Sequence, residues 1–315
     1  MERSFRRSGF DCPGCIEPSE RRSLPLPARS GSWSSPFSGV ILMQGRGFRQ
    51  DRIWLLAGTG EGPQLAAALE RHGWRVSVSV VTAAAACAYS ELDLDQINVG
   101  ALQGREAITA ALKADLPFRC VVDATHPFAC QISADLQRAC AAVGQPLLRF
   151  ERSLERGEKG CLLNQWGDLA QADIRGRSLF LAIGGRHLSM AHAVARAAGA
   201  EVFARCLPSA TGLRLALAAG LPPDHLAVLR PLQGAEPGSI ERALCRRWGI
   251  TTVLCRQSGG VTERLWRRVS DELNLDLLLL RRPAPPAGVE TVDCEADLLR
   301  CLYGPSSSPL QSTHD

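Results

Sequence analysis

The feature that most constrains the fold is a repeated alternation of short apolar segments with segments of helical periodicity, which begins at residue 52. The first apolar segment, IWLLAG, is followed by a glycine-rich turn and then by an Ala- and Leu-rich helical segment, Pro63–His72. Strands that alternate with helices of this length require right-handed crossover connections, and they form a parallel sheet covered by helices on both faces. The pattern therefore predicts an α/β protein.

The alternation runs through two parts of the chain. Residues 51–150 hold further predicted strands and helices at Arg75–Val81, Arg105–Ala114, Cys120–Ala124, Ala129–Val143 and Pro146–Arg149. After a poorly patterned connection at residues 151–176, the alternation resumes within residues 177–303, at Ser178–Gly184, His187–Ala198, Glu201–Cys206, Leu213–Ala219, Leu226–Leu229, Ser239–Trp248, Thr251–Cys255, Glu263–Leu273, Asp276–Leu280 and Glu295–Leu302. We therefore expect two α/β domains with parallel sheets, and a cleft between them that is available for a ligand.

The two ends of the chain differ in composition from the part that alternates. Residues 1–50 contain clusters of Arg, Ser, Pro and Gly without a helical or strand period, which predicts a disordered N-terminal extension. An alternative is that translation starts at Met43. Residues 304–315 form a polar tail that we also expect to be disordered. Cys12 and Cys15 form a single C-P-G-C, and because a zinc site needs a second pair of ligands, we expect no metal.

Charge, hydropathy and cysteine usage exclude several kinds of partner. The net charge is +4 and no stretch of the globular part has five or more consecutive basic residues, so we expect no nucleic acid. The longest weakly polar stretch, Val76–Tyr89, is shorter than the roughly 20 residues that span a bilayer, so we expect no membrane segment. The cysteines are scattered rather than placed at framework spacings, which is typical of a cytoplasmic protein with reduced thiols.

The basic residues are nearly all arginines. Lys113 and Lys159 are the lysines of the chain, so arginine accounts for almost all of its 36 basic residues. The planar guanidinium group matches carboxylates and phosphates with two parallel hydrogen bonds. A pocket for a polyanion and a codon bias toward arginine both explain this excess, and the sequence leaves both explanations open.

The first candidate site is the glycine-rich turn at residues 58–62, GTGEG, between the first strand and the helix that follows. Such a turn offers backbone N–H groups and a helix N-terminus to a phosphate. The G-x-G-x-x-G match is incomplete because Pro63 stands at the third glycine position, where it suits the first turn of a helix. Nucleotide binding is the favoured interpretation, and a glycine turn needed only for chain reversal is the alternative.

The end of the second strand bears on the choice of dinucleotide. In NAD-specific folds a carboxylate that binds the ribose lies about 20 residues after the glycines. This region here has the sequence VVTAAAACAY, and the first acidic residue after it is Glu91. The absence of a nearby carboxylate favours NADPH, with NADH as the alternative.

The second candidate site is the segment Asp123–Ala129, DATHPFA, at the carboxyl end of a predicted strand, where ligands of open α/β sheets bind. Thr125 offers a hydroxyl, His126 offers a group that titrates near neutrality, and Pro127 stiffens the turn. A functional histidine and a histidine that makes only a structural hydrogen bond are about equally consistent with this pattern.

The third candidate site is the segment QSGG at residues 257–260, which lies between a predicted strand and a helix in the second part of the chain. A serine followed by two glycines is consistent with a small anion-binding loop. The sequence contains no G-x-S-x-G, no Walker motif, no H-E-x-x-H and no paired cysteine sites, so hydrolase and ATPase activities are not supported.

Four segments together resemble the precorrin-6A reductase family of cobalamin biosynthesis. These segments are AGTGEG at 57–62, VVDATHPFA at 121–129, ARCLPS at 204–209 and CRQSGG at 255–260, and their order and spacing match over nearly all of residues 52–303. The resemblance implies an oxidoreductase with two Rossmann-like domains, in which NADPH or NADH reduces one C=C bond of precorrin-6A or of its cobalt-containing form. In that family the hydride goes to C19 and a proton to C18. The resemblance also implies transient contact with neighbouring enzymes of the pathway.

The resemblance and the motif positions together suggest roles for individual residues. The residues assigned to the cofactor or the cleft around it are Gly58, Thr59, Gly60, Glu61, Ser258, Gly259 and Gly260. The residues assigned to the substrate are Thr125, His126 and Phe128 at the rim and Arg205 as a carboxylate partner, with His126 as the candidate proton donor and solvent as its alternative. One departure from the family is Arg152-Ser153-Leu154-Glu155, where Arg-Pro-x-Trp is usual.

Two other functions compete with a precorrin reductase. A short-chain reductase would need a Tyr-x-x-x-Lys pair, but neither Tyr89 nor Tyr303 has a lysine four residues later. A module that senses NADPH by binding it without turnover stays open, because the glycine turn alone does not distinguish binding from catalysis.

Overall fold

The structure is a computed structural model that describes residues 51–114, 117–157, 160–230, 234 and 236–303. The predicted extension at residues 1–50 and the predicted tail at 304–315 lie outside the described residues, as do Cys12 and Cys15. Within the described residues, no helix is long and apolar enough to cross a membrane.

The first sheet has six parallel strands in the order β12-β5-β4-β1-β2-β3. These strands are β1 (Arg52–Ala57), β2 (Arg75–Val80), β3 (Gln96–Val99), β4 (Cys120–Ala124), β5 (Leu147–Phe150) and β12 (Glu290–Val292). The central strands β1 and β4 are buried along their whole length, as expected for apolar segments covered on both faces. Leu55 of β1 is paired with Val78 of β2 on one side and with Val122 of β4 on the other.

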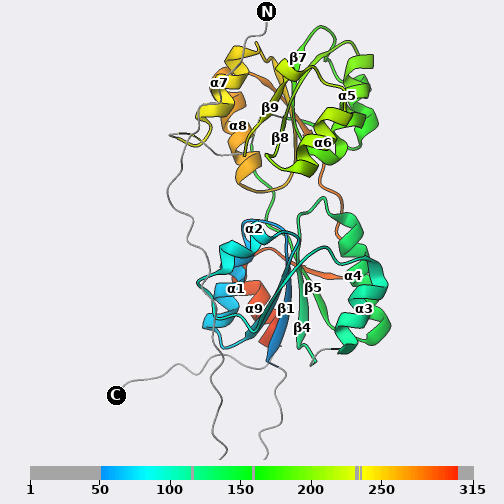
Figure 1. Cartoon of the computed structure of the whole chain (residues 1–315), viewed down its shortest axis with the longest axis vertical. Coiled ribbons are helices and arrows are strands. Elements are labelled where there is room, and N and C mark those ends of the chain that lie inside the picture. The colour runs from blue at the N-terminus through cyan, green and yellow to red at the C-terminus, as the bar shows by residue number, and fades with distance from the viewer. Residues whose placement is uncertain (1–50, 115–116, 158–159, 231–233, 235, 304–315) are drawn as a thin grey trace, which may run out of the picture. The chain divides into compact units, whose positions relative to one another are not determined.

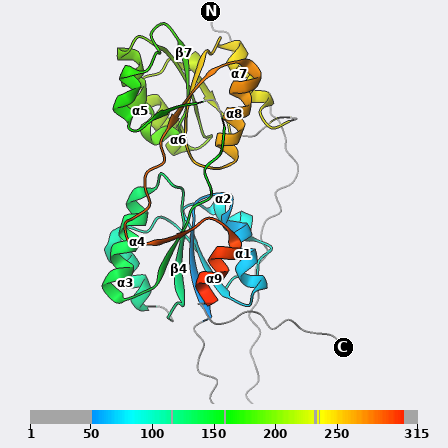
Figure 2. The same ribbon diagram turned by 180° about the vertical axis from the view of Figure 1, so that it is seen from behind.

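Helices cover both faces of the first sheet (Figure 1 and Figure 2). The helices α1 (Gly62–Arg71) and α9 (Glu295–Tyr303) pack on one face, and α3 (Gly104–Ala114) and α4 (Cys130–Val143) pack on the other. The short helix α2 spans Ala83–Ala86. The helix α4 ends at Val143 because Gly144 adopts a left-handed conformation with φ 68°.

The second sheet repeats this architecture with the strand order β6-β11-β10-β7-β8-β9, again all parallel. Its strands are β6 (Cys161–Leu163), β7 (Ser178–Ala182), β8 (Glu201–Cys206), β9 (Leu226–Val228), β10 (Thr252–Arg256) and β11 (Asp276–Leu280). One face is covered by α5 (Leu188–Ala197) and α6 (Ala210–Ala218), and the other by α7 (Ser239–Arg247) and α8 (Val261–Leu273) (Figure 1). The predicted fold class, α/β with two Rossmann-like parallel sheets, is confirmed.

Two crossing connections, which the sequence pattern did not predict, exchange edge strands between the sheets. After β5 the chain forms β6 at the edge of the second sheet, and after β11 it returns as β12 at the edge of the first. The helix α9 then packs against α1. Residues 290–303, expected with the C-terminal part, therefore belong to the first sheet. Each of these edge strands has three residues, too few to show a periodicity of its own.

The strand order reverses between β1 and β4 in the first sheet and between β7 and β10 in the second. Ligands of open α/β sheets bind at this reversal, outside the carboxyl ends of the strands. All of the described residues fall within one compact unit, so the domain boundary at residue 150 stays a prediction.

Candidate functional site

A cavity of about 870 Å³ lies at the carboxyl ends of the strands of the first sheet. The residues that line it from this sheet follow β1, β2, β3 and β4, and they include Gly58, Val81, Ala101, Thr125, His126 and Phe128. The cavity is also lined by residues of the second half of the chain, which include Trp166, Arg186, His187 and Arg281. The sequence-predicted residues Gly58, Thr125, His126 and Phe128 are thus brought together at one cavity.

The glycine turn after β1 approaches the loop after β4 closely. A Cβ atom at Gly58 would lie 3.3 Å from the backbone nitrogen of His126, which is tighter than ordinary contact. A Cβ atom at Gly60 would have no protein atom within 4 Å, so this position is open. The helix α1 begins at Gly62 with Pro63 in its first turn, and the side chain of Glu61 makes no capping hydrogen bond. The turn therefore leaves a helix N-terminus uncapped by a side chain.

Arg152 connects the glycine turn with the loop at residues 258–260. Its Nη1 atom lies 2.5 Å from Glu61 Oε1, and its Nε atom donates a hydrogen bond to the carbonyl oxygen of Ser258 at 2.8 Å. Burial acts to raise the pKa of Glu61, but a hydrogen bond from Thr59 and the charge of Arg152 outweigh it, so this pKa is lowered. The acidic residue of the turn is therefore ionised and neutralised by Arg152. Thr59, Gly60 and Glu61 are not among the residues that line the cavity.

The loop Ser258–Gly260 was predicted to lie at the cofactor or in the cleft around it, but it lies away from the cavity. It is buried, and it does not line the cavity. A Cβ atom at Gly259 would collide with the guanidinium group of Arg282, and one at Gly260 would collide with that of Arg152. The N–H group of Gly259 donates to Glu263 Oε2 at 2.7 Å. The two glycines thus make room for arginines, and the N–H group of Gly259 is paired with a carboxylate of the protein.

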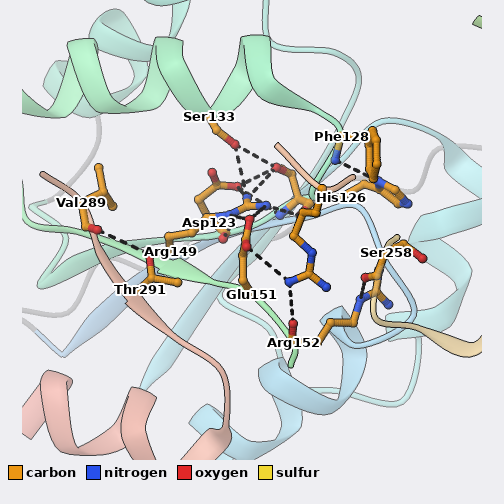
Figure 3. Close-up of polar contacts among 12 residues, drawn as sticks. Asp123, His126, Phe128, Ser133, Arg149, Glu151, Arg152, Ser258, Val289 and Thr291 are labelled. Atoms are coloured by element: carbon orange, nitrogen blue, oxygen red, sulfur yellow. Dashed lines mark hydrogen bonds and ion pairs between the residues drawn. The ribbon is translucent and has the colours of Figure 1, made fainter. Parts of the chain in front are cut away.

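The segment after β4 is held by a buried ion-pair network (Figure 3). Arg149 Nη1 lies 2.7 Å from Asp123 Oδ1, and Arg149 Nη2 lies 3.2 Å from Glu151 Oε1. The hydroxyl of Thr125 donates to Asp123 Oδ1 at 2.7 Å and accepts from Arg149 Nη1 at 3.1 Å. Arg149 is 1% exposed, so these bonds are shielded from water. The network fixes the loop that carries His126, and it uses the Thr125 hydroxyl that the sequence assigned to substrate.

His126 is a neutral imidazole in this structure. Its Nδ1 atom lies 3.2 Å from the backbone nitrogen of Phe128, which donates a hydrogen bond to it, so the ring proton is on Nε2. The pKa of His126 is lowered from 6.5 to about 3. Burial of the ring is the largest cause, the positive charge of Arg256 is the next, and further arginines act in the same direction. The free protein therefore presents a hydrogen-bond donor at this position rather than a cation.

Phe128 and Arg205 were both predicted to contact substrate, but they differ in their position relative to the cavity. Phe128 lines the cavity, packs against the core cluster between the second sheet and α5 and α6, and lies under the guanidinium group of Arg256, 5.2 Å from its ring centroid. Arg205 does not line the cavity. Burial lowers its pKa, and the charge of Glu241 on α7 opposes that effect. Arg205 thus faces the opposite side of the second sheet from Phe128.

The sequence did not single out the turn after β7. Gly184 and Gly185 follow this strand, and Arg186 and His187 line the cavity. The ring of His187 stacks on Trp166 with 5.0 Å between the centroids. The signal was a glycine pair at the end of the predicted strand Ser178–Gly184 and before a predicted helix, an arrangement similar to the turn after β1.

Comparison with known proteins identifies the family. Residues 52–302 match the family described as precorrin-6x reductase CbiJ/CobK. The chain belongs to this family. A cobalt-precorrin-6A reductase of Synechocystis sp. is 33% identical over 247 residues, which cover 76% of this chain and 92% of the relative. A precorrin-6A reductase of Mycobacterium tuberculosis is 29% identical over 246 residues, which cover 77% of this chain and 93% of that protein. The family resemblance predicted from the sequence is confirmed.

A solved structure supports the fold of this precorrin-6x reductase family member. The structure of "CobK precorrin-6A reductase" matches with a TM-score of 0.62 and 24% sequence identity, and the match covers 80% of this chain and 96% of that chain. At this level of identity the likeness establishes the shared two-sheet fold.

Proposed function

We propose that the protein is a precorrin-6A reductase of cobalamin biosynthesis, in which NADPH reduces one C=C bond of precorrin-6A or of its cobalt-containing form. The observation that carries the proposal is the cavity at the strand-order reversal of the first sheet, lined both by Gly58 and by His126 and Phe128. A dinucleotide and a second, flat reactant need such a shared space. Membership of the precorrin-6x reductase family supports the same reaction.

The residues after β1 fit the phosphates of a dinucleotide. The space beside Gly60 is open, and the N-terminus of α1 has no capping side chain, so both leave room for phosphate oxygens. The carboxylate of Glu61 alone would repel them. Arg152 neutralises that carboxylate, which supports Gly58, Thr59, Gly60 and Glu61 as the cofactor turn. We do not include Ser258, Gly259 and Gly260, because their loop is filled by arginine side chains.

The end of β2 supports NADPH over NADH. The cavity is lined there by Ser79, Val80 and Val81, none of which is acidic. Among the described residues that line the cavity, Asp135 alone has a carboxylate, and it lies on α4, where its side chain binds Gln131 and Arg138. A ribose 2′-phosphate, as in NADPH, therefore meets no acidic residue at this strand end. The 2′-hydroxyl of NADH would lack the carboxylate that usually binds it.

The protein has to orient the two reactants and shield them from water. When bound, the reduced nicotinamide supplies the hydride. The loop after β4 is fixed by the buried Asp123–Arg149 ion pair, so the positions of His126 and Phe128 relative to Gly58 are set before any ligand binds. A site whose geometry is already formed lowers the entropic cost of bringing two reactants together.

Reduction of the C=C bond also needs a proton, and we propose His126 as its donor. In the free protein burial of the ring, and after it the surrounding arginines, lower the pKa of His126 and keep the imidazole neutral. A substrate that carries carboxylates offsets this positive charge, so the ring gains a proton more easily when the substrate is bound. Solvent is the alternative donor, and the two are distinguished by the effect of His126→Gln on turnover at constant affinity for cofactor.

Anaerobic oxidation of NADPH, followed by absorbance with precorrin-6A and with its cobalt-containing form offered separately, tests the function. We expect turnover with at least one of the two macrocycles. Binding of NADPH without turnover on either one would instead support the sensing module, which binds the cofactor at the same turn.

A further inference from the structure

A positively charged wall lies on the side of the cavity that belongs to the second sheet. The strands β7 and β10 are neighbours in this sheet, so the turn after β7 and Arg256 at the end of β10 lie together. Arg256 Nη2 lies 3.8 Å from where a Cβ atom of Gly184 would be. Arg186 and His187 follow Gly184 in the same turn and line the cavity. The wall therefore combines Arg186 and His187, which line the cavity, with Arg256, which is half-buried and contacts the lining residue Phe128 without lining the cavity itself.

Within the part of the chain that the structure describes, neither Arg186 nor Arg256 forms an ion pair with a carboxylate. The contact of Arg256 is with the ring of Phe128, which itself lines the cavity. The pKa of Arg256 is lowered to about 10, chiefly by burial; Cys255 opposes this effect, and the charges of Arg186 and Arg205 add to it. The positive charges of Arg186 and Arg256 thus repel each other, and no carboxylate of the described residues neutralises either of them.

The histidines of the cavity report the same excess of positive charge. The pKa of His187 is lowered by burial and then by Arg256 and Arg186. The pKa of His126 is also lowered, with Arg256 as the largest charge effect. Partly buried like charges destabilise a protein unless a counter-charge binds them. The wall is therefore a place where an anion gains more than it would at an exposed arginine.

We propose that Arg186 and Arg256 bind a peripheral carboxylate of the macrocyclic substrate, at the second-sheet side of the cavity. This inference rests on the proposed function. A carboxylate suits the site because the planar guanidinium group donates two parallel hydrogen bonds to its two oxygens. The phosphates of the cofactor have their own place at the turn after β1, in the other sheet. Phe128, flat under Arg256, then supplies the apolar surface on which the ring of the macrocycle rests.

The test uses the full chain and the variants Arg186→Gln, Arg256→Gln and Arg256→Lys. The control is Arg196→Gln, which removes an exposed arginine on α5 that does not line the cavity. The first probe is uroporphyrin, a flat tetrapyrrole with eight carboxylates, compared with its octamethyl ester by fluorescence titration at constant ionic strength. NADPH binding is measured in parallel, followed by KM and kcat with precorrin-6A.

We expect each glutamine variant to weaken uroporphyrin binding about tenfold or more and to leave NADPH binding within about twofold. In turnover, KM for precorrin-6A rises more than kcat falls, and Arg256→Lys lies between the wild type and Arg256→Gln because it keeps the charge but loses the planar fork. Arg196→Gln behaves as the wild type.

Three results would overturn the proposal. They are wild-type affinity for uroporphyrin in both glutamine variants, an equal loss of NADPH and uroporphyrin binding, and a wild-type protein that binds the octamethyl ester as well as the free acid. If the wild type fails to reduce either macrocycle but the glutamine variants still lose uroporphyrin binding, the reductase function is contradicted while the carboxylate site stands.

Discussion

Arg152 Nη1 lies 2.5 Å from Glu61 Oε1, so the residue that follows β5 by two positions neutralises the acidic residue of the turn that follows β1. The other crossing connection has an arginine at the matching place. Arg282 follows β11 by two positions, and its Nη1 atom donates to the carbonyl oxygen of Arg152 at 2.7 Å. The two connections between the sheets are thus joined to each other and to the glycine turn after β1.

We expect Arg152→Ala to raise the dissociation constant of NADPH about tenfold, because the Glu61 carboxylate would then face the phosphates without a partner. Isothermal titration of the purified variant measures this. The double variant Arg152→Ala, Glu61→Gln should recover most of the lost affinity, because it also removes the negative charge. Equal affinities for the single and the double variant would show that the ion pair does not act through Glu61.

The two glycines of the cofactor turn should respond differently to a methyl group. A Cβ atom at Gly60 meets no protein atom, so Gly60→Ala should change the free energy of unfolding by less than about 0.5 kcal/mol while it weakens NADPH binding about tenfold. Gly58→Ala should reduce both stability and binding, because its Cβ atom lies 3.3 Å from the backbone nitrogen of His126. Thermal unfolding and NADPH titration separate these effects. Unchanged NADPH binding in Gly60→Ala would place the cofactor elsewhere.

Arg149 should be necessary for stability. Its replacement by methionine leaves the carboxylates of Asp123 and Glu151 buried without their shared cation, so we expect a loss of about 3 to 5 kcal/mol in the free energy of unfolding. The comparison is Arg138→Gln, which removes a half-exposed ion pair with Asp135 and should cost less than about 1 kcal/mol. Urea unfolding of both variants measures this. Similar losses for the two would mean that burial of the network contributes little.

The neutral state of His126 predicts how stability depends on pH. The pKa of this group is about 3 in the folded protein and 6.5 when unperturbed, so the unfolded chain takes up a proton as the pH falls below about 6.5 while the folded protein does not. Its contribution therefore lowers stability as the pH falls from about 6.5 toward 3, and the loss between pH 7 and 5 amounts to about 2 kcal/mol. His126→Gln should lose less stability over this range. Parallel losses in the two proteins, measured by urea unfolding at several pH values, would mean that His126 is already charged at pH 5.

Periodicity predicted most of the fold, because the central strands and their helices carry long apolar patterns. The strands β4, β8 and β11 begin and end where the sequence pattern placed them. The edge strands β6 and β12 were missed, because each pairs with a strand far away in the sequence and is too short to show a pattern. Pairing between distant segments is not encoded in local periodicity.

The candidate site was predictable where a motif coincides with a strand end. Gly58 and His126 meet at the cavity because β1 and β4 are neighbouring parallel strands whose carboxyl ends share one edge. The loop at 258–260 shows the limit of this argument, since its glycines have the same local pattern but make room for Arg152 and Arg282. Only the tertiary structure distinguishes a glycine that admits a ligand from one that admits a side chain.

The central claim is that a nicotinamide cofactor, whose phosphates bind at the turn after β1, transfers hydride directly to a macrocycle in the adjoining cavity. The most direct measurement uses NADPH labelled with deuterium at C4, with the two faces labelled in separate samples, and mass spectrometry of the macrocycle after anaerobic turnover in ordinary water. The account predicts a product one mass unit heavier with one of the two labelled cofactors and unlabelled product with the other. Oxidation of NADPH that leaves no deuterium in the macrocycle with either label would contradict it.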